Sequence, residues 1–272
     1  MTPIRNGDSA GATPGNGRPP LVPEARFSDR VDDYVAYRPG YPVALLELLE
    51  RECGLRASAA VADVGSGTGK LTGLLLPRAA RVYAVEPNGP MRAAAERLLG
   101  GRPGFQSVDG RAEATGLPTG SVALVTAGQA FHWFQPEPTR AEFRRILVPE
   151  GFVALIWNSR FEEDSPYIAE YEQFLRQYSV DYDRADHRRT TPRVAVAAFF
   201  ADSTLRDAEF PNPQVLDLAA VQGAYRSASY AYRPDHPRHA EAMARLAELF
   251  QRHQSGGRVT SPLRCRVFWG RP

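Results

Sequence analysis

Apolar residues along this chain gather in short runs that alternate with stretches of helical spacing. The runs at 59–64, 81–85, 105–108, 121–127 and 152–157 have the length of strands, and the run at 59–64 is apolar enough to be a buried parallel strand. Between them, apolar residues follow one face of a helix at 42–53, 71–76, 91–99 and 139–147. Thr139 and Glu142 form a capping-box pattern at the start of the last of these helices. The alternation predicts an α/β fold with a parallel sheet.

After residue 160 the pattern changes. Tyr167, Tyr171, Phe174 and Tyr178 recur at helical spacing, which predicts a helix over 164–178 with a broad aromatic face. Shorter patterns predict helices at 194–200, 219–229 and 237–252, a late strand at 205–216 and a final strand at 263–269. We expect the helices of 161–200 and 218–255 to pack together as a lid over the sheet, where substrate specificity would lie.

Local composition divides the chain into three parts. Residues 1–24 are rich in Gly, Pro, Ser and Asn and have almost no apolar periodicity, so they are predicted to be a disordered tail. Residues 25–160 would form an N-terminal strap and a ligand-binding core. Residues 161–272 would form the helical lid, interleaved with the last two strands of the core.

Overall composition narrows the possible partners. The 272 residues are 43% hydrophobic, and 33 basic against 31 acidic side chains give a net charge of +2, with Lys70 the only lysine. This small net charge gives no indication of nucleic-acid binding, and no apolar run in the sequence is long enough to span a membrane. Cys53 and Cys265 match no metal or redox spacing. We therefore expect a soluble cytoplasmic protein without a metal, whose oligomeric state the sequence leaves open.

A glycine-rich turn follows the first predicted strand, in Asp63-Val-Gly-Ser-Gly-Thr-Gly69. Glycine at every second position allows positive φ and close approach of a ligand to the backbone. The pattern departs from the dinucleotide fingerprint G-x-G-x-x-G, because Lys70 stands where its third glycine would be. Asp63 would repel a phosphate but suits a ligand that carries an ammonium group.

The second predicted strand ends in Glu86. In a fold of this kind an acid at that position accepts hydrogen bonds from two ribose hydroxyls. A ribose joined to an amino acid, with no phosphate, describes S-adenosylmethionine. The turn and Glu86 together therefore predict a site for that cofactor.

Several separate stretches carry a family resemblance. They are Arg26-Phe-Ser, Tyr37-Arg-Pro-Gly-Tyr-Pro42, Asp63 to Gly69, Gly110-Arg-Ala-Glu113, Gly128-Gln-Ala-Phe-His-Trp-Phe134 and Ile156-Trp-Asn158. In this order they resemble the class I S-adenosylmethionine-dependent methyltransferases, and more narrowly the small-molecule branch of trans-aconitate methyltransferase-like proteins. The resemblance implies a Rossmann-like, doubly wound, seven-stranded sheet with an antiparallel last strand and a helical lid inserted after strand five. Ala123 departs from the family, which usually has an aspartate there.

The resemblance also implies a set of cofactor-binding residues. They are Tyr34, Arg38, Asp63, Gly65, Ser66, Gly67, Thr68, Gly69, Glu86, Pro87, Met91, Ala112, Glu113 and Gln129. In similar proteins Arg38 meets the methionine carboxylate, Met91 lies against the adenine, the Ala112 amide faces a ring nitrogen and Glu113 approaches the exocyclic amine. Simpler interpretations stay open: Tyr34 and Met91 as packing residues, Arg38 on the surface, and 109–113 as a surface loop.

The segment after the fourth predicted strand carries the candidate catalytic residue, His132, beside Trp133. Parallel sheets bind ligands at the carboxyl ends of their strands, so both residues would flank the methyl-transfer site. An imidazole titrates near neutral pH and can take a proton from an acceptor, although His132 can equally be a residue that only shapes the pocket. Trp133 and Asn158 are the candidate substrate contacts.

These features lead to a functional prediction. We expect an S-adenosylmethionine-dependent methyltransferase that acts by in-line transfer on a small-molecule acceptor in specialised biosynthesis. One alternative is an enzyme of the same fold that catalyses a non-methylating reaction such as cyclisation. Another is a non-catalytic binding protein, against which the intact turn, Asp63 and Glu86 argue. The acceptor, and whether oxygen, nitrogen or carbon is methylated, cannot be read from the sequence.

Overall fold

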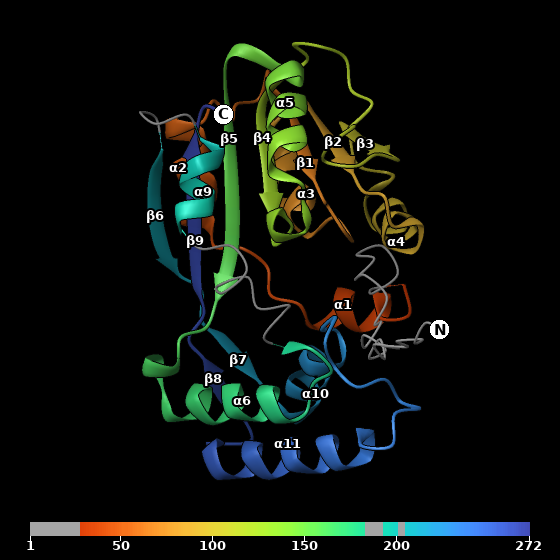
Figure 1. Cartoon of the computed structure of the whole chain (residues 1–272), viewed down its shortest axis with the longest axis vertical. Coiled ribbons are helices and arrows are strands. Elements are labelled where there is room, and N and C mark those ends of the chain that lie inside the picture. Colours follow the sequence, from red (N-terminus) through yellow and green to blue (C-terminus); the bar gives the residue numbers. More distant parts are fainter. Residues whose placement is uncertain (1–27, 183–192, 201–204) are drawn as a thin grey trace, which may run out of the picture.

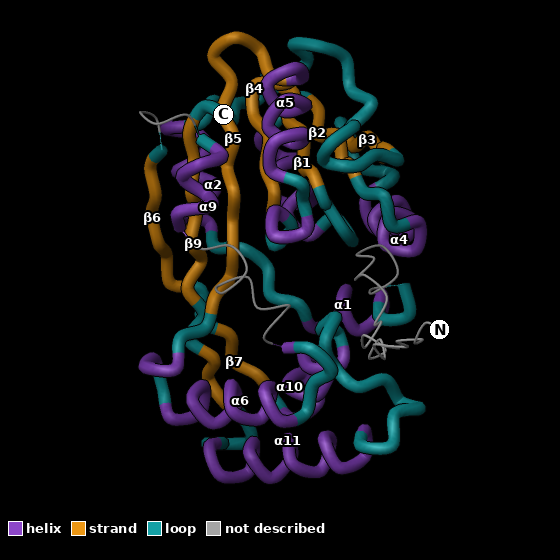
Figure 2. The backbone as a smooth tube through the Cα atoms, viewed as in Figure 1, coloured by secondary structure: helices purple, strands orange, loops and turns teal. Residues whose placement is uncertain are grey.

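The computed structural model describes residues 28–182, 193–200 and 205–272 (Figure 1). The predicted disordered tail at 1–24 lies outside the described residues. The described chain forms two layers, a sheet flanked by helices and a smaller helical layer at the carboxyl ends of the parallel strands (Figures 1 and 2). No helix within the described ranges is long and apolar enough to cross a membrane.

Seven of the described strands form the main sheet. They are β1 (Ala60–Val64), β2 (Arg81–Val85), β3 (Phe105–Val108), β4 (Val122–Gly128), β5 (Leu147–Ser159), β6 (Arg206–Pro211) and β9 (Arg264–Gly270). Their order is β3-β2-β1-β4-β5-β9-β6, with β1 to β5 parallel and β9 antiparallel to both of its neighbours. The predicted Rossmann-like sheet with an antiparallel last strand is confirmed.

Helices cover both faces of this sheet. One face packs on α2 (Val43–Glu52), α3 (Lys70–Leu75) and α4 (Gly89–Leu99), the other on α5 (Pro136–Ile146) and α9 (Arg193–Phe199). Successive side chains of a strand point to opposite sides of the sheet. In β1, Val61 therefore packs on the face covered by α2, α3 and α4, and Ala62 on the face covered by α5 and α9. The short helical turns are η2 (Leu76–Arg78), η3 (Phe131–Trp133) and η4 (Glu162–Asp164).

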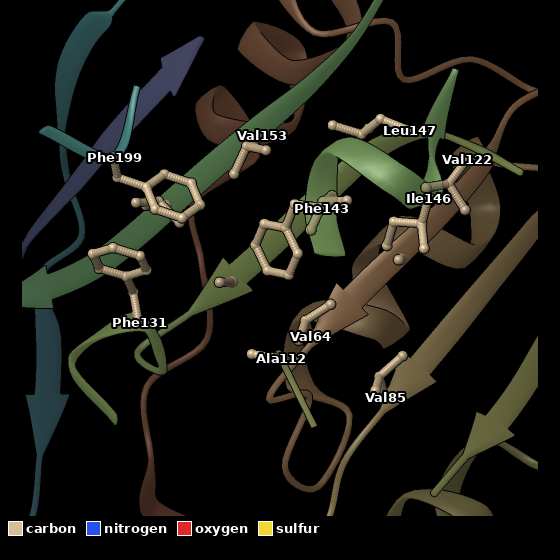
Figure 3. Packing of buried hydrophobic residues seen from close by; sticks show 14 of the residues in the cluster. Val64, Val85, Ala112, Val122, Phe131, Phe143, Ile146, Leu147, Val153 and Phe199 are labelled. Carbon is tan, nitrogen blue, oxygen red and sulfur yellow. The ribbon is translucent and has the colours of Figure 1, made fainter. Parts of the chain in front are cut away.

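Helix α9 differs from the prediction, which placed it in the lid. Phe199 packs instead between Phe131 and Phe143 in the core beneath the sheet, with ring centroids 4.9 and 5.9 Å away (Figure 3). The helical spacing of 194–200 was correct, but spacing alone does not say which layer receives an apolar face. Burial of three phenylalanines here stabilises the sheet rather than the lid.

The second layer contains α6 (Pro166–Gln177), α10 (Leu218–Arg226), α11 (His239–His253) and the ribbon of β7 (Gln214–Leu216) and β8 (Val259–Ser261). Its aromatic core includes Phe174, which stacks on Tyr178 and meets Tyr225 edge to face. The helices predicted at 164–178, 219–229 and 237–252 pack together in this layer, without the helix predicted at 194–200. We call these five elements the lid layer.

The single strand predicted at 205–216 is two strands. Asn212 and Pro213 separate β6, in the main sheet, from β7, in the lid layer. Proline lacks the N–H that a ladder needs, so the segment turns there from one layer into the other. The partner strand β8 was not predicted, because three residues are too few to show an alternating pattern.

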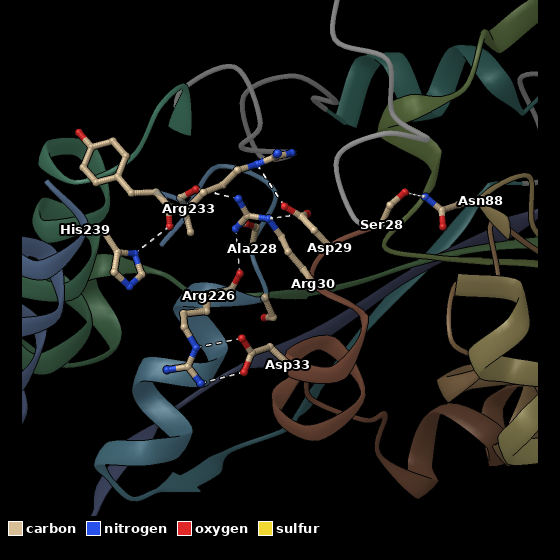
Figure 4. A network of polar contacts seen from close by, with 12 residues as sticks. Ser28, Asp29, Arg30, Asp33, Asn88, Arg226, Ala228, Arg233 and His239 are labelled. Atoms are coloured by element: carbon tan, nitrogen blue, oxygen red, sulfur yellow. Dashed lines mark hydrogen bonds and ion pairs between the residues drawn. The ribbon is translucent and has the colours of Figure 1, made fainter. Parts of the chain in front are cut away.

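Helix α1 (Val31–Tyr37) connects the two layers as a strap (Figure 4). The Arg30 guanidinium donates to the carbonyl oxygens of Arg226, Ala228 and Ala231, at 2.7 to 2.9 Å, in the segment that ends α10. Arg226 in turn makes a bidentate pair with Asp33. These bonds fix α1 against the lid layer.

Helix α5 begins earlier than its capping-box pattern indicated. Its N-cap is Gln135, and Thr139 is buried within the helix. Glu142 does not reach back to the helix start, because it accepts hydrogen bonds from the backbone and the hydroxyl of Thr115 at 2.8 and 2.5 Å and pairs with Arg145. The Glu142 side chain therefore makes a tertiary contact with Thr115 and does not cap the helix.

Candidate active site

The glycine turn between β1 and α3 is shaped by close packing on one side and open space on the other. Gly65 donates its N–H to the Val85 carbonyl at 2.9 Å, and a Cβ on Gly65 would lie 2.5 Å from that of Ala130. Gly67 has a φ of 57°, and a Cβ there would meet nothing within 4 Å. The first glycine is thus needed for packing, and the second exposes bare backbone to a cavity.

Glu86 stands at the end of β2, facing this turn. Its two carboxylate oxygens accept the N–H groups of Gly67 at 2.8 Å and Asn88 at 2.9 Å. Burial raises the pKa of Glu86, and the two backbone bonds oppose that rise. The carboxylate is 8% exposed and keeps a fixed orientation.

A cavity of about 300 Å³, which we call the first cavity, lies beside Glu86. Its lining comes from the turn, from α1, from the ends of β2 and β4, from the loop after β3 and from the segment before α5. The residues are Tyr34, Gly65, Gly67, Glu86, Pro87, Asn88, Met91, Arg111, Ala112, Glu113, Gly128, Gln129, Ala130, Trp133, Phe134 and Gln135. Glu113 also accepts the Gln135 N–H at 2.9 Å, which ties the loop to the start of α5.

Asp63 lies deeper, at the end of β1. Both carboxylate oxygens accept threonine hydroxyls, from Thr72 at 2.6 Å and Thr126 at 2.9 Å. The residue is 1% exposed, and burial raises its pKa to about 6, more than the threonine bonds lower it. Asp63 therefore ionises at a higher pH than an ordinary aspartate.

A second cavity, of about 170 Å³, continues past Asp63 towards the lid layer. It shares Tyr34, Gly65, Gly128, Gln129 and Trp133 with the first cavity, so these residues form a common wall. Its other side is formed by residues of α1, α6 and α10 and by the segments that join the lid layer to the sheet. The two cavities together run along the carboxyl ends of β1, β4 and β5.

Two cations line the second cavity near the glycine turn. Lys70 donates to the Val35 carbonyl at 2.8 Å, and Arg38 donates to the Ser227 carbonyl at 3.2 Å with its guanidinium 5.4 Å from the Tyr34 ring centre. No carboxylate in the described part of the chain pairs with Arg38. A ligand carboxylate at this place would neutralise the charge of Arg38.

His132, Trp133 and Asn158 all line the second cavity. His132 and Trp133 lie on η3, with ring centroids 4.9 Å apart. Asn158 donates to the Gly40 carbonyl at 3.0 Å and accepts from Asn212 at 2.9 Å. Asn158 therefore anchors the loop after α1 as well as facing the cavity.

The two cavities bring together most of the residues predicted from sequence. Of the predicted cofactor-binding residues, only Thr68 and Gly69 line neither cavity. Thr68 is buried, and Gly69 is the N-cap of α3, where a Cβ would lie 2.5 Å from Leu99. Gly69 has a φ of 81°, so its role is to allow the backbone to turn into α3.

Sequence reasoning missed a group of lining residues that come from separate elements. They include Asn88, Arg111, Phe134 and Gln135 in the first cavity and Tyr37, Tyr41, Arg160, Tyr171, Tyr182 and Tyr230 in the second. Asn88 could have been noticed in the sequence as an N-cap residue, because it is the N-cap of α4. The aromatic face predicted for 164–178 did not indicate a cavity, and only the packing of the two layers shows that Tyr167 and Tyr171 line one.

The residues present fit a nucleoside joined to an amino acid. Glu86 is held beside an open glycine, as an acceptor for two hydroxyls. Further along, Asp63 and Arg38 offer an anion and a cation to an amino acid. The buried Ser66 hydroxyl on the turn has no hydrogen-bond partner within the described residues, which leaves it for a ligand.

Comparisons with known proteins agree with this geometry. The model of a family described as "Methyltransferase domain" matches residues 62–155. Two proteins of Schizosaccharomyces pombe are similar. An uncharacterized methyltransferase is 33% identical over 56% of this chain and 59% of its own length, and an uncharacterized methyltransferase-like protein is 28% identical over 82% of this chain and 85% of its own length. An uncharacterized methyltransferase of Mycobacterium bovis is 36% identical over 50% of this chain and 53% of its own. The chain thus spans little more than half of two of these three relatives.

Among solved structures, a putative type II methyltransferase from Anaeromyxobacter dehalogenans has the same fold, with a TM-score of 0.63 and 24% identity over 87% of this chain and 98% of its own. The fold and the arrangement of the site are similar to those of class I S-adenosylmethionine-dependent methyltransferases. Residues 62–155, which the methyltransferase-domain model matches, include the glycine turn, Glu86 and His132.

Proposed function

We propose that this protein transfers the methyl group of S-adenosylmethionine to a small-molecule acceptor in specialised biosynthesis. The observation that carries the proposal is the second cavity, which continues the cofactor site and is closed on its far side by the strap and the lid layer. A cavity lined from both layers suits a small molecule better than a polymer. The trans-aconitate methyltransferase-like branch and a cytoplasmic location belong to the same proposal.

In this proposal the first cavity holds the adenosine. Glu86 binds the ribose hydroxyls, while Met91 and Ala112 lie along the adenine. Met91 is 3% exposed and donates its N–H to the Asn88 side chain, so its position is set by the start of α4. The role of Glu113 at the exocyclic amine is compatible with its bond to Gln135, which uses one carboxylate oxygen.

The amino acid end of the cofactor lies, in this proposal, at the junction of the two cavities. Arg38 takes the carboxylate and Asp63 the ammonium group, with Gln129 and Tyr34 as walls. The bound cofactor supplies an electrophilic methyl group on a sulfonium. The protein contributes mainly by positioning the acceptor in line with it, which is worth about 7–11 kcal/mol in favourable cases.

His132 is the proposed general base for an acceptor that must lose a proton. It lies on the wall of the second cavity, next to Trp133, which also borders the first. Such a base accelerates a reaction by about 10² to 10⁴-fold. A carboxylate acceptor would need no base, and His132 would then shape the pocket.

Calorimetric titration with S-adenosylmethionine, S-adenosylhomocysteine and NAD tests the cofactor site. Binding of the two sulfur ligands and not of NAD is expected, because Asp63 and Lys70 replace features that a pyrophosphate needs. A screen of small acceptors for S-adenosylhomocysteine release then tests the reaction. Turnover of an acceptor without release of this product would instead support a non-methylating reaction.

A further inference from the structure

The end of the second cavity that lies in the lid layer has walls of tyrosine. Tyr37 comes from α1, Tyr167 and Tyr171 from α6, and Tyr182 and Tyr230 from the segments after α6 and α10. Tyr167, Tyr171 and Tyr182 are each 6% exposed. Burial raises the pKa of all three, to about 12 for Tyr167, so that their phenols stay neutral. Such walls suit a flat, unsaturated ligand.

The charged group of this aromatic end is Arg160, the residue after β5. Its guanidinium lies 5.1 Å from the centre of the Tyr171 ring, and its Nε donates to Glu172 at 3.1 Å. Glu172 is fully buried and also accepts from the Tyr182 hydroxyl. Glu172 does not line the cavity, whereas Arg160 does and is 24% exposed. The pair therefore presents its cationic member to the cavity in a fixed orientation.

The sign of the charge separates two classes of ligand. Aromatic walls with an acid at their centre suit an ammonium ion, since both the ring faces and the acid attract a cation. Here the cations lining the second cavity in the described residues are Arg38, Lys70 and Arg160, and the only acid is Asp63, at the glycine turn. An arginine between aromatic rings favours an anion with a planar, two-oxygen geometry.

We infer that the acceptor is an aromatic carboxylic acid, with its carboxylate on Arg160 and its ring between Tyr171 and Tyr182. The inference rests on the proposed function and adds the substrate class. A carboxylate fits better than a phosphate, because Glu172 already offsets part of the Arg160 charge and a single negative charge is enough to balance the remainder.

The experiment measures binding of matched acids and amides by calorimetry, with and without saturating S-adenosylhomocysteine. The probes are benzoate, phenylacetate, trans-cinnamate and indole-3-acetate, each beside its primary amide, with hexanoate as the non-aromatic acid. We expect at least one aromatic acid to bind about tenfold more tightly than its amide and than hexanoate, as a charge-assisted hydrogen bond predicts.

Arg160→Gln should reduce this preference for the acid to about threefold or less, while Arg160→Lys keeps part of it. Because Arg160→Gln strands the buried Glu172, the double variant Arg160→Gln/Glu172→Gln is measured beside it. Arg245→Gln is the matched control, since Arg245 is 57% exposed on α11 and does not line the cavity. S-adenosylhomocysteine affinity should stay within about twofold in every variant.

Two results would overturn the inference. One is that no aromatic acid in the panel binds more tightly than its amide, and the other is that the double variant keeps the preference. Failure of the proposed function appears differently, as loss of S-adenosylhomocysteine binding in the parent protein. The acid and amide comparison made without that ligand remains decisive in that case.

Discussion

Glu86 owes its orientation to two backbone N–H groups rather than to another side chain. An acid held in this way can accept two hydroxyls without rearrangement, which lowers the entropic cost of binding a ribose. The structure thereby gives a physical reason for an acid at the end of β2.

Glu86→Ala should weaken S-adenosylhomocysteine binding by tens-fold or more, because two hydrogen bonds to a charged group are lost, each worth about 1.5–3 kcal/mol. Calorimetric titration measures the change. Glu150→Ala, at a side chain 76% exposed on β5, is the control and should bind as the parent does. An affinity of Glu86→Ala within twofold of the parent would refute the ribose assignment.

The raised pKa of Asp63 predicts how the stability of the protein depends on pH. Its pKa of about 6 in the folded protein lies above the ~3.9 of an unfolded aspartate, so its contribution to stability is complete below pH ~4 and is lost as the pH rises to about 6. A bound ammonium group favours the carboxylate and counteracts this loss. S-adenosylmethionine should therefore raise the melting temperature more at pH 7.5 than at pH 5.

Asp63→Asn is the matched variant for this experiment, since it keeps the shape and removes the charge. In it, the stabilisation by S-adenosylmethionine should be smaller and nearly equal at the two pH values. Equal stabilisation of the parent at pH 5 and pH 7.5 would mean that Asp63 does not meet the ammonium group.

His132 is tested by separating binding from turnover. His132→Gln should lower kcat by about 10² to 10⁴-fold if the imidazole takes a proton from the acceptor, with S-adenosylhomocysteine affinity within about twofold. The dependence of kcat on pH should lose its acidic limb as well. A variant with parental kcat but a higher KM would show that His132 only shapes the pocket.

At the scale of elements, Glu142 joins α5 to the loop that follows β3. It accepts both the N–H and the hydroxyl of Thr115, while Arg145 donates to the Leu117 carbonyl at 2.8 Å. The same loop carries Ala112 to the first cavity. Hydrogen bonds from Arg145 and Thr115 lower the pKa of Glu142 to about 2, despite its burial.

Glu142→Gln should reduce the free energy of unfolding by about 1–3 kcal/mol at pH 7. Because the folded pKa is depressed, this contribution is present above the unfolded pKa of ~4.3 and is lost as the pH falls towards about 2. Urea titrations at pH 7, 4 and 3 should show a shrinking difference from the parent. Glu137→Gln, an exposed acid on the same helix, is the control, and a difference that does not change with pH would contradict the assignment.

The sequence predicted the positions of β1 to β4 because short runs of strand length, bounded by turn residues, mark them locally. β2 and β3 have the predicted bounds, and β1 differs by one residue. The errors lie elsewhere: β5 extends over 147–159 instead of 152–157, α9 packs on the sheet instead of in the lid layer, and Asn212 and Pro213 divide one predicted strand. In the site, Gly67 and Glu86 follow from local pattern, whereas Arg160 and the tyrosine walls exist only once the two layers pack.

At the scale of the whole molecule, the strap α1 is held mainly by polar contacts, and none of its residues is fully buried. Tyr37 packs where Gly223 of α10 leaves room, since a Cβ there would lie 2.1 Å from its ring. Arg30, 8% exposed, supplies the bonds to the end of α10. The strap thus depends on a few charged groups at its start.

Arg30→Gln should therefore lower the free energy of unfolding by about 2–4 kcal/mol, because buried carbonyl groups of the 226–231 segment lose their donor. It should also weaken S-adenosylhomocysteine binding, since α1 carries Tyr34. Urea titration and calorimetry measure the two effects. Arg56→Gln, at an exposed arginine bonded only to Ser58 among the described residues, should change neither, and an unchanged ligand affinity in Arg30→Gln would separate the strap from the cofactor site.

Tyr34 and Trp133 belong to the walls of both cavities. A ligand that fixes these side chains from one side spares a ligand on the other side the entropy of ordering them. The methyl donor and the methyl acceptor would then be heterotropic effectors of each other. Thermodynamic linkage requires each of them to change the affinity of the protein for the other by the same factor. Through the shared Tyr34 and Trp133 side chains, a ligand bound in one cavity would in this way change the affinity of the other cavity for its ligand.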